Sequence, residues 1–177
     1  MKSLQTALFF AALTVPFGAM ANERLFLQVP VQLAPGAFVP QSVKNECELE
    51  RHLADEASTQ LTKEYGRVEL AGPREDVGND KVIKITITNA WGAGGGGWSG
   101  PKSLQMLAEL KQGDVTLSSA LFRRTTNVSG LFQGTCAMFH KITRVLGKDV
   151  AEWMKDGAPP TPGAAEAAGE PARKPAE

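Results

Sequence analysis

Three consecutive segments with a two-residue repeat of apolar and polar side chains dominate the middle of this sequence. In residues 81–89 isoleucines alternate with lysine and threonine, and the repeat returns in 104–110 and 115–121. Neighbouring side chains of a β-strand point to opposite faces, so this repeat predicts an antiparallel meander with one buried face. The Gly113-Asp114 pair has the composition of a tight hairpin turn. We expect the buried face to carry Ile83, Ile85, Ile87, Leu104, Met106, Ala108, Leu110, Val115, Leu117 and Leu121.

A glycine-rich segment, WGAGGGGW at residues 91–98, joins the first two of these predicted strands. Glycine lets a backbone approach another surface closely, and exposed indoles are effective anchors at interfaces. The segment is therefore our candidate binding surface. An alternative is that one or both tryptophans fold back and cap the core, because large aromatic side chains are usually mostly buried. The candidate binding residues are Trp91, Gly94, Gly95, Gly96, Gly97, Trp98 and Ser99.

The same segment superficially matches motifs for nucleotide binding and for a catalytic serine. A G-x-G-x-x-G match is nearly guaranteed in a glycine run, and the dinucleotide site also needs a helix after the loop. Here Pro101 and an alternating strand follow instead. Pro101 also interrupts a P-loop pattern and a nucleophile elbow around Ser99. We therefore predict neither a phosphate site nor a catalytic serine.

Two amphipathic helices flank the meander region. The first is predicted from Ser42 to Tyr65, with Gly66 as its stop signal, and the second from Thr135 to Asp156, before Gly157. Apolar side chains recur every three or four residues in both. The first stripe is Val43, Cys47, Leu49, Leu53, Ala54, Ala57, Leu61 and Tyr65, and the second is Cys136, Phe139, Ile142, Leu146, Val150 and Trp153. Gly147 inside the second helix indicates either close backbone contact, which we favour, or a slight break in the helix.

The order of elements predicts an α+β fold. A first strand is expected at 24–31. Pro30 has no N–H to donate to a neighbouring strand, so this strand either ends there or lies at an edge of the sheet. A turn is expected at 34–37 and a short strand at 68–70. Together with the meander, this gives a single antiparallel β-sheet of about four or five strands with two amphipathic helices packed on one face.

Residues 1–21 have the features of a secretory signal peptide. Lys2 precedes a short apolar run, and Ala19-Met20-Ala21 predicts cleavage between Ala21 and Asn22. The run is shorter than the roughly 18 residues that a membrane-spanning helix needs. We expect one domain at 22–157 and a disordered tail at 158–177, which is rich in proline, alanine and glycine. No transmembrane segment is expected in the mature chain.

The sequence contains two cysteines, Cys47 and Cys136. An even count in an exported chain predicts a disulfide. The alternative is a metal site with His52 and His140, but the spacing fits poorly and exported thiols are normally oxidised. A disulfide brings the starts of the two helices together. Either the strand at 68–70 is then no hairpin arm, or residues 126–134 cross the sheet; we favour the crossing segment.

The remaining composition argues against several function classes. Lysine and arginine total 19 and aspartate and glutamate total 19, so no charge signature of nucleic-acid binding is present. Only His52 and His140 titrate near neutral pH, and neither lies in a recognisable catalytic constellation. We therefore expect no catalytic residues, no cofactor and no metal, and consider an enzyme less favoured than a binding protein.

A resemblance supports this view. The glycine-rich loop, the strand pair and the SGLFQG segment at 129–134 before an amphipathic helix are similar to small bacterial envelope domains of unknown function. The resemblance covers 42–153 and implies a periplasmic or secreted, non-enzymatic accessory that binds another envelope protein or a cell-wall component. Unlike many such domains, this chain lacks a lipidation cysteine. The alternative is a small periplasmic hydrolase or ligand-binding protein that uses the tryptophan-flanked loop.

Overall fold

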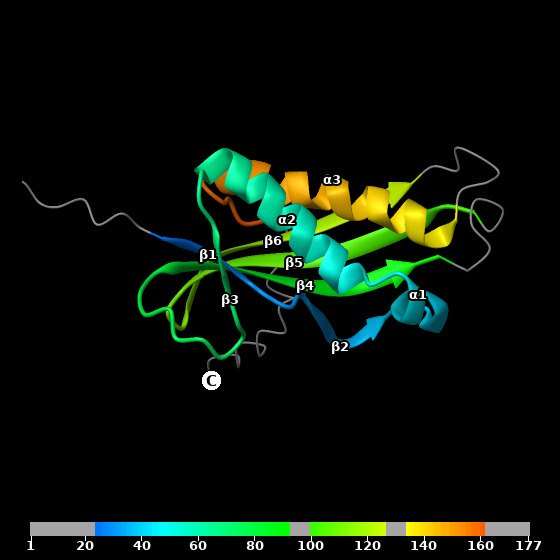
Figure 1. Ribbon diagram of the computed structural model, residues 1–177, viewed down its shortest axis with the longest axis horizontal. Coiled ribbons are helices and arrows are strands. Elements are labelled where there is room, and N and C mark those ends of the chain that lie inside the picture. Colours follow the sequence, from blue (N-terminus) through cyan, green and yellow to red (C-terminus); the bar gives the residue numbers. More distant parts are fainter. Residues whose placement is uncertain (1–23, 93–99, 127–133, 162–177) are drawn as a thin grey trace, which may run out of the picture.

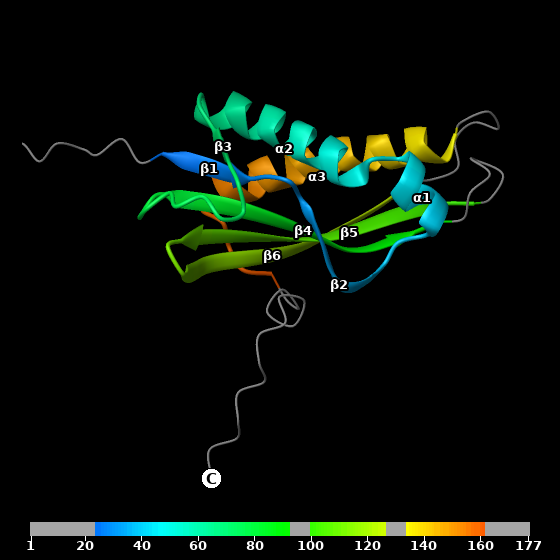
Figure 2. The same cartoon turned by 60° about the horizontal axis from the view of Figure 1, so that its bottom comes forward.

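The computed structural model describes residues 24–92, 100–126 and 134–161. It has an α+β fold in which one six-stranded sheet carries the helices on one face (Figures 1 and 2). The predicted class and the helix-on-sheet arrangement are therefore confirmed. In chain order the elements are β1 (Leu25–Gln28), β2 (Gln32–Phe38), α1 (Gln41–Glu46), α2 (Leu49–Tyr65), β3 (Glu69–Ala71), β4 (Lys81–Trp91), β5 (Lys102–Gln112), β6 (Val115–Thr126) and α3 (Thr135–Lys155).

The predicted meander is present as β4, β5 and β6. Both pairings are antiparallel, and Ile85 of β4 lies opposite Ala108 of β5. Gln112 pairs with Val115, so only Gly113 and Asp114 form the turn. Gly113 has a φ of 55°, a left-handed conformation that glycine adopts without steric cost. The end of the sheet formed by these strands follows the sequence pattern closely.

The sheet is mixed, which corrects the prediction of a wholly antiparallel one. The order is β3-β1-β4-β5-β6, and β1 is parallel to both of its neighbours. The chain crosses between β1 and β3 through α2, and a helical crossover returns the chain to the same end of the sheet. β2 is parallel to the second half of β4, after a cis peptide bond between Val29 and Pro30. The predicted turn at 34–37 is wrong, because these residues lie inside β2 at a break in its register.

This topology also resolves the question raised by the two cysteines. β3 pairs with β1 in parallel, so it is not a hairpin arm of β4. Figure 1 shows α2 and α3 lying side by side over the sheet, with their first turns at the same end. The alternative that we had not favoured is therefore correct. Of the segment to which we assigned a crossing, 126–134, residues 127–133 lie outside the described residues.

The predicted first helix is two helices. α1 ends at Cys47, and Glu48 has a φ of 44° before α2 begins. A left-handed residue cannot continue a helix, so the chain changes direction there. The break places Cys47 beside the first turn of α3, where it forms a disulfide with Cys136. Apolar periodicity did not reveal this break because buried residues continue on both sides of it.

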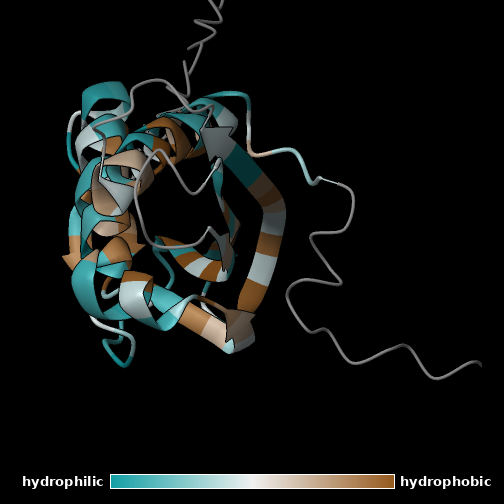
Figure 3. Cartoon of the chain, turned by 90° about the vertical axis from the view of Figure 1, so that its right-hand side faces the viewer, coloured by the Kyte–Doolittle hydropathy of each residue, from teal (hydrophilic) through white to brown (hydrophobic). Residues whose placement is uncertain are grey.

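The core lies between the helices and the sheet. All positions of the predicted stripe of α3 are buried or packed against the core, and Phe122 of β6 contacts Trp153 edge to face at 6.2 Å. Tyr65, which we placed in the stripe of α2, is instead 41% exposed. Seen from the end of the sheet, hydrophobic and more hydrophilic bands alternate along a strand (Figure 3). This is the pattern of a sheet with one face on a core.

Arg124 of β6 joins the helix layer to the sheet. Its Nε and Nη2 donate to the two carboxylate oxygens of Asp149 of α3, at 2.7 and 2.6 Å. Asp149 is buried, and the hydrogen bonds that Arg124 donates to this carboxylate raise the pKa of Arg124. Arg123 precedes Arg124 in the same strand. They lie on opposite faces, because neighbouring residues of a strand alternate.

The buried face of β6 differs from the prediction. The pairing with β5 slips between Leu110 and Lys111, which leaves Leu117 as an extra residue. Such a bulge reverses which side chains face the core. Leu117 is 47% exposed and Leu121 is only partly buried, whereas Ala120 is buried and Phe122 packs on the core. Val115, at the start of the strand, is 62% exposed.

The chain after α3 passes along the outer edge of β6. Trp153 Nε1 donates to the carbonyl oxygen of Pro159 at 2.8 Å, and Ala158 is buried. Thr161 then donates its N–H to the Ser119 oxygen, and its Oγ1 accepts from the N–H of Leu121. The first residues of the predicted tail therefore cover part of an edge strand, a common protection against edge-to-edge association.

Candidate functional site

A bulge near the end of β4 determines where Trp91 lies. Ile87 pairs with Met106 and Asn89 pairs with Gln105, so Thr88 is an extra residue. Without it, the alternation of Ile83, Ile85 and Ile87 would place Trp91 on the core face. With it, Ala90 is buried and Trp91 is 64% exposed. Trp91 therefore lies on the sheet face that points away from the helices, which we call the open face.

Phe38 at the end of β2 holds the Trp91 ring. The two ring centroids are 5.6 Å apart, with the planes tilted by 37°, within the range of favourable aromatic pairs. Phe38 itself is 55% exposed. The pair therefore forms an apolar surface that neighbouring strands β2 and β4 position. Trp91 does not cap the core, so the alternative interpretation fails for this tryptophan; Trp98 lies outside the described residues.

A small pocket lies beside this aromatic pair. Its volume is about 90 Å³, and it is lined by Asn89, Trp91, Ser103, Gln105 and Arg123. These residues come from three strands, because Trp91 pairs with Ser103 and Gln105 pairs with both Asn89 and Arg123. The Nε of Arg123 donates to Ser103 Oγ at 3.2 Å. We name this group, together with Phe38, the Trp91 site.

Two polar atoms at the bulge lack hydrogen bonds. Thr88 Oγ1 and Asn89 Oδ1 are buried, and neither has a partner in the structure. A buried polar atom without a partner typically costs about 1–3 kcal/mol, and bulges occur often beside functional sites. The stability cost and the backbone irregularity both occur beside the pocket. Ser118 Oγ, beside the bulge of β6, is a third buried polar atom without a partner among the described residues.

The strands that lead into and out of the glycine-rich segment are closely packed at its base. Gly92 lies over Lys102, and a Cβ on Gly92 would come within 2.3 Å of Lys102 Cδ. Lys102 is fully buried, and its Nζ donates to the Gly100 oxygen at 3.1 Å. Burial lowers the pKa of the Lys102 ammonium group. Gly92 is therefore required by packing, a role separate from binding.

The structure tests only part of the predicted binding surface. Gly94, Gly95, Gly96, Gly97, Trp98 and Ser99 lie outside the described residues. Sequence reasoning missed Phe38, Asn89, Ser103, Gln105 and Arg123. The polar alternation of β5 contains a signal for Ser103 and Gln105, whereas nothing in the local sequence pairs Phe38 with Trp91.

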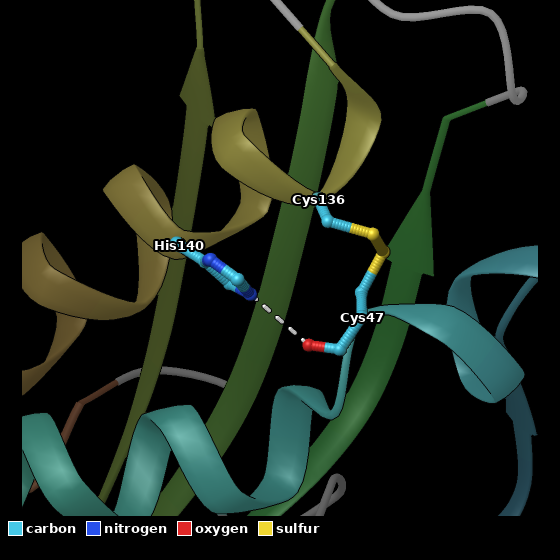
Figure 4. The surroundings of a disulfide bond; sticks show 3 residues. All are labelled: Cys47, Cys136 and His140. Atoms are coloured by element: carbon cyan, nitrogen blue, oxygen red, sulfur yellow. Dashed lines mark hydrogen bonds between the residues drawn. A yellow bond between two sulfur atoms is a disulfide. The ribbon is translucent and has the colours of Figure 1, made fainter.

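The second group of reactive side chains lies at the start of α2 and α3. Cys47 and Cys136 form the predicted disulfide, and His140 Nε2 lies 3.1 Å from the Cys47 oxygen (Figure 4). His52 of α2 stacks on His140, with ring centroids 3.6 Å apart. His52 is half-buried. Burial, and then the nearby charge of His140, lower the pKa of His52.

Cys47 and Cys136 are joined in a disulfide, so neither has a free thiol that could bind a metal. Within residues 24–92, 100–126 and 134–161, no three histidine, cysteine, aspartate or glutamate side chains are grouped as metal ligands would be. None of the α-helices in these same ranges combines the length and the apolar character that a membrane crossing requires.

No protein-family model matches this chain, and no curated protein matches it. Three bacterial proteins of known structure are similar to it. The PelC dodecamer from Paraburkholderia phytofirmans is 13% identical with a TM-score of 0.49, over 72% of this chain and 84% of that one. The DUF330 protein XCC0632 from Xanthomonas campestris is 12% identical with a TM-score of 0.47, over 74% and 83%.

The third is a homologue of the neuraminyllactose-binding hemagglutinin from Helicobacter pylori. It is 10% identical with a TM-score of 0.42, over 82% of this chain and 89% of that one. Identities and scores of this size are too low to assign a function, so the function is argued from the site itself.

Proposed function

We propose that this protein is an exported, non-enzymatic binding module of the bacterial cell envelope, and that the Trp91 site binds its partner. The observation that carries the proposal is the exposure of Trp91. A bulge turns a large indole away from an available core and onto the open face, where Phe38 holds it. Leaving so much apolar surface in water is unfavourable. A binding partner that covers the ring would explain the arrangement.

The disulfide and the amino-terminal sequence support export. The Cys47–Cys136 bond joins residues 89 positions apart, and such bonds persist in oxidising compartments. Residues 1–21 carry the pattern of a signal peptide. The periplasm or the medium is therefore the proposed location.

The chemistry of the pocket favours binding over hydrolysis. Its described lining consists of an indole, two amides, a hydroxyl group and a guanidinium group. General acid–base catalysis at neutral pH usually uses histidine, a carboxylate or another titrating group. The described lining contains none of these, which makes the hydrolase alternative the weaker one.

Photocrosslinking in cells tests the proposal. A photoreactive amino acid would replace Thr125, an exposed residue that pairs with Ser103 beside the pocket, and in a second strain it would replace Val115, which is exposed elsewhere on the surface. We expect an adduct with an envelope component from position 125 and none from position 115. Adding Trp91→Ala should remove the adduct, because the partner loses its aromatic contact.

The matched control for Trp91→Ala is Val115→Ala, which also truncates an exposed apolar side chain. It should leave the adduct at position 125 unchanged. The same adducts from both crosslinking positions, or an adduct that persists after Trp91→Ala, would contradict a specific site at Trp91.

A further inference from the structure

We propose that the ligand of the Trp91 site is an acidic glycan, bound through a sugar unit that carries a carboxylate. This inference rests on the proposed binding function and names the chemical class of the partner. Three features of the site support it: an exposed flat ring, a set of polar groups suited to hydroxyls, and a guanidinium group with no acidic partner.

The flat ring provides the contact for a sugar face. One face of a pyranose ring is lined by C–H groups, which pack against an aromatic surface and are removed from water there. Trp91 is the most exposed large hydrophobic side chain in the described part of the chain, at 64%. Its contact with Phe38 at 5.6 Å orients the ring before any ligand arrives, which lowers the entropy cost of binding.

The polar groups are matched to hydroxyls. Asn89, Ser103 and Gln105 line the pocket, and their amide and hydroxyl groups both donate and accept hydrogen bonds. A sugar hydroxyl has the same dual capacity. An apolar peptide side chain in this pocket would leave these groups unpaired, which is unfavourable. The lining therefore favours a saccharide over a hydrophobic protein segment.

Arg123 supplies the preference for an acid. It shares a strand with Arg124, but Arg124 faces the helices and is paired with Asp149. The interaction recorded for Arg123 is the hydrogen bond from its Nε to Ser103 Oγ, and no carboxylate in the described residues is paired with it. Guanidinium groups bind carboxylates through two parallel N–H donors. The terminal nitrogens of Arg123 are the groups that would bind the ligand.

The size of the pocket agrees with a ligand whose acid group enters the pocket and whose ring lies against Trp91. The pocket is small, at about 90 Å³, and has space for a carboxylate. The ring would lie outside the pocket, against Trp91, with its acid group directed toward Arg123. Neutral sugars would keep the ring contact and lose the charged one.

The test is an NMR titration of the purified protein from Asn22 onward, followed through the tryptophan indole N–H signals. The Trp91 signal is assigned with Trp91→Phe. The probes are tetragalacturonate and tetramannuronate, each with its methyl ester, which keeps the ring and removes the charge. We expect at least one acid to shift the Trp91 signal, and its ester to bind about ten-fold or more weakly, because the charge-assisted hydrogen bonds are lost.

Arg123→Gln should make the acid and its ester bind equally, whereas Arg74→Gln, an exposed arginine elsewhere, should change nothing. Equal binding of acid and ester to the unaltered protein, or no shift of the Trp91 signal with either acid, would overturn the inference. A Trp91-dependent crosslink to a protein would also overturn it, while leaving the proposed binding function intact. If no crosslink in cells depends on Trp91, the binding function itself is refuted.

Discussion

Gly147 lies where α3 crosses α2, and there is no room at this position for a methyl group. A Cβ there would lie 2.8 Å from the backbone carbon of Glu56. Alanine has the higher helix propensity, by about 1 kcal/mol. Backbone atoms cannot move aside as a flexible side chain would, so overpacking of about 1–3 kcal/mol should outweigh that gain.

We therefore expect Gly147→Ala to lower the free energy of unfolding, measured by chemical denaturation. Gly134→Ala is the matched control. Gly134 precedes α3 with a φ of −65°, and no atom lies within 4 Å of a Cβ there. A Gly147→Ala protein as stable as the Gly134→Ala protein would show that the two helices separate more easily than the structure indicates.

At the scale of single residues, the sequence supported some inferences and not others. A glycine in the apolar stripe of a helix indicates a close approach, and Gly147 makes one. The pairing of Cys47 with Cys136 followed from there being only two cysteines. The left-handed conformation of Glu48 carried no such signal, because a glutamate between apolar residues is normal in a helix.

At the scale of elements, the stacked histidines connect α2 and α3. Burial is the largest cause that lowers the pKa of His52 below its ordinary value of 6.5, followed by the charges of His140 and Arg51. Glu48 and Asp55 oppose the shift. The unfolded chain therefore binds a proton more readily than the folded one. The stability that the neutral ring provides is complete above about pH 6.5 and is lost as the pH falls below that value.

Thermal unfolding between pH 7.5 and 5.5 checks this prediction. We expect the melting temperature of the unaltered protein to fall across this range, and that of His52→Gln to fall less. The disulfide is present in both proteins and does not titrate. Identical pH dependence in the two proteins would mean that His52 does not contribute to the acid sensitivity.

The two bulges explain why the strands and most of their buried face were predicted well, whereas the faces of the residues after each bulge were not. A period of two identifies a strand wherever it holds, and β4, β5 and β6 were found in this way. One extra residue, Thr88 in β4 or Leu117 in β6, reverses the face of every later side chain. The sequence around these residues does not differ from regular strand. The exposure of Trp91, and with it the site, therefore depends on a feature that the alternation cannot reveal.

At the scale of the whole molecule, local pattern predicted the α+β class, and non-local pairing determined the rest. The parallel pairing of β1 with β3 and β4 joins segments more than forty residues apart through α2. A local repeat in the sequence does not indicate which strands become neighbours in the sheet. For the same reason the sequence could nominate Trp91, but not the residues from β2, β5 and β6 that surround it.

The central claim is that the Trp91 site attaches this protein to a component of the cell envelope. Co-sedimentation with purified envelopes measures this most directly, with Trp91→Ala, Arg123→Gln and Val115→Ala compared with the unaltered protein. We predict that the unaltered and Val115→Ala proteins pellet with the envelopes, and that Trp91→Ala and Arg123→Gln each bind about ten-fold or more weakly while remaining folded. Equal pelleting of Trp91→Ala and the unaltered protein would contradict the account.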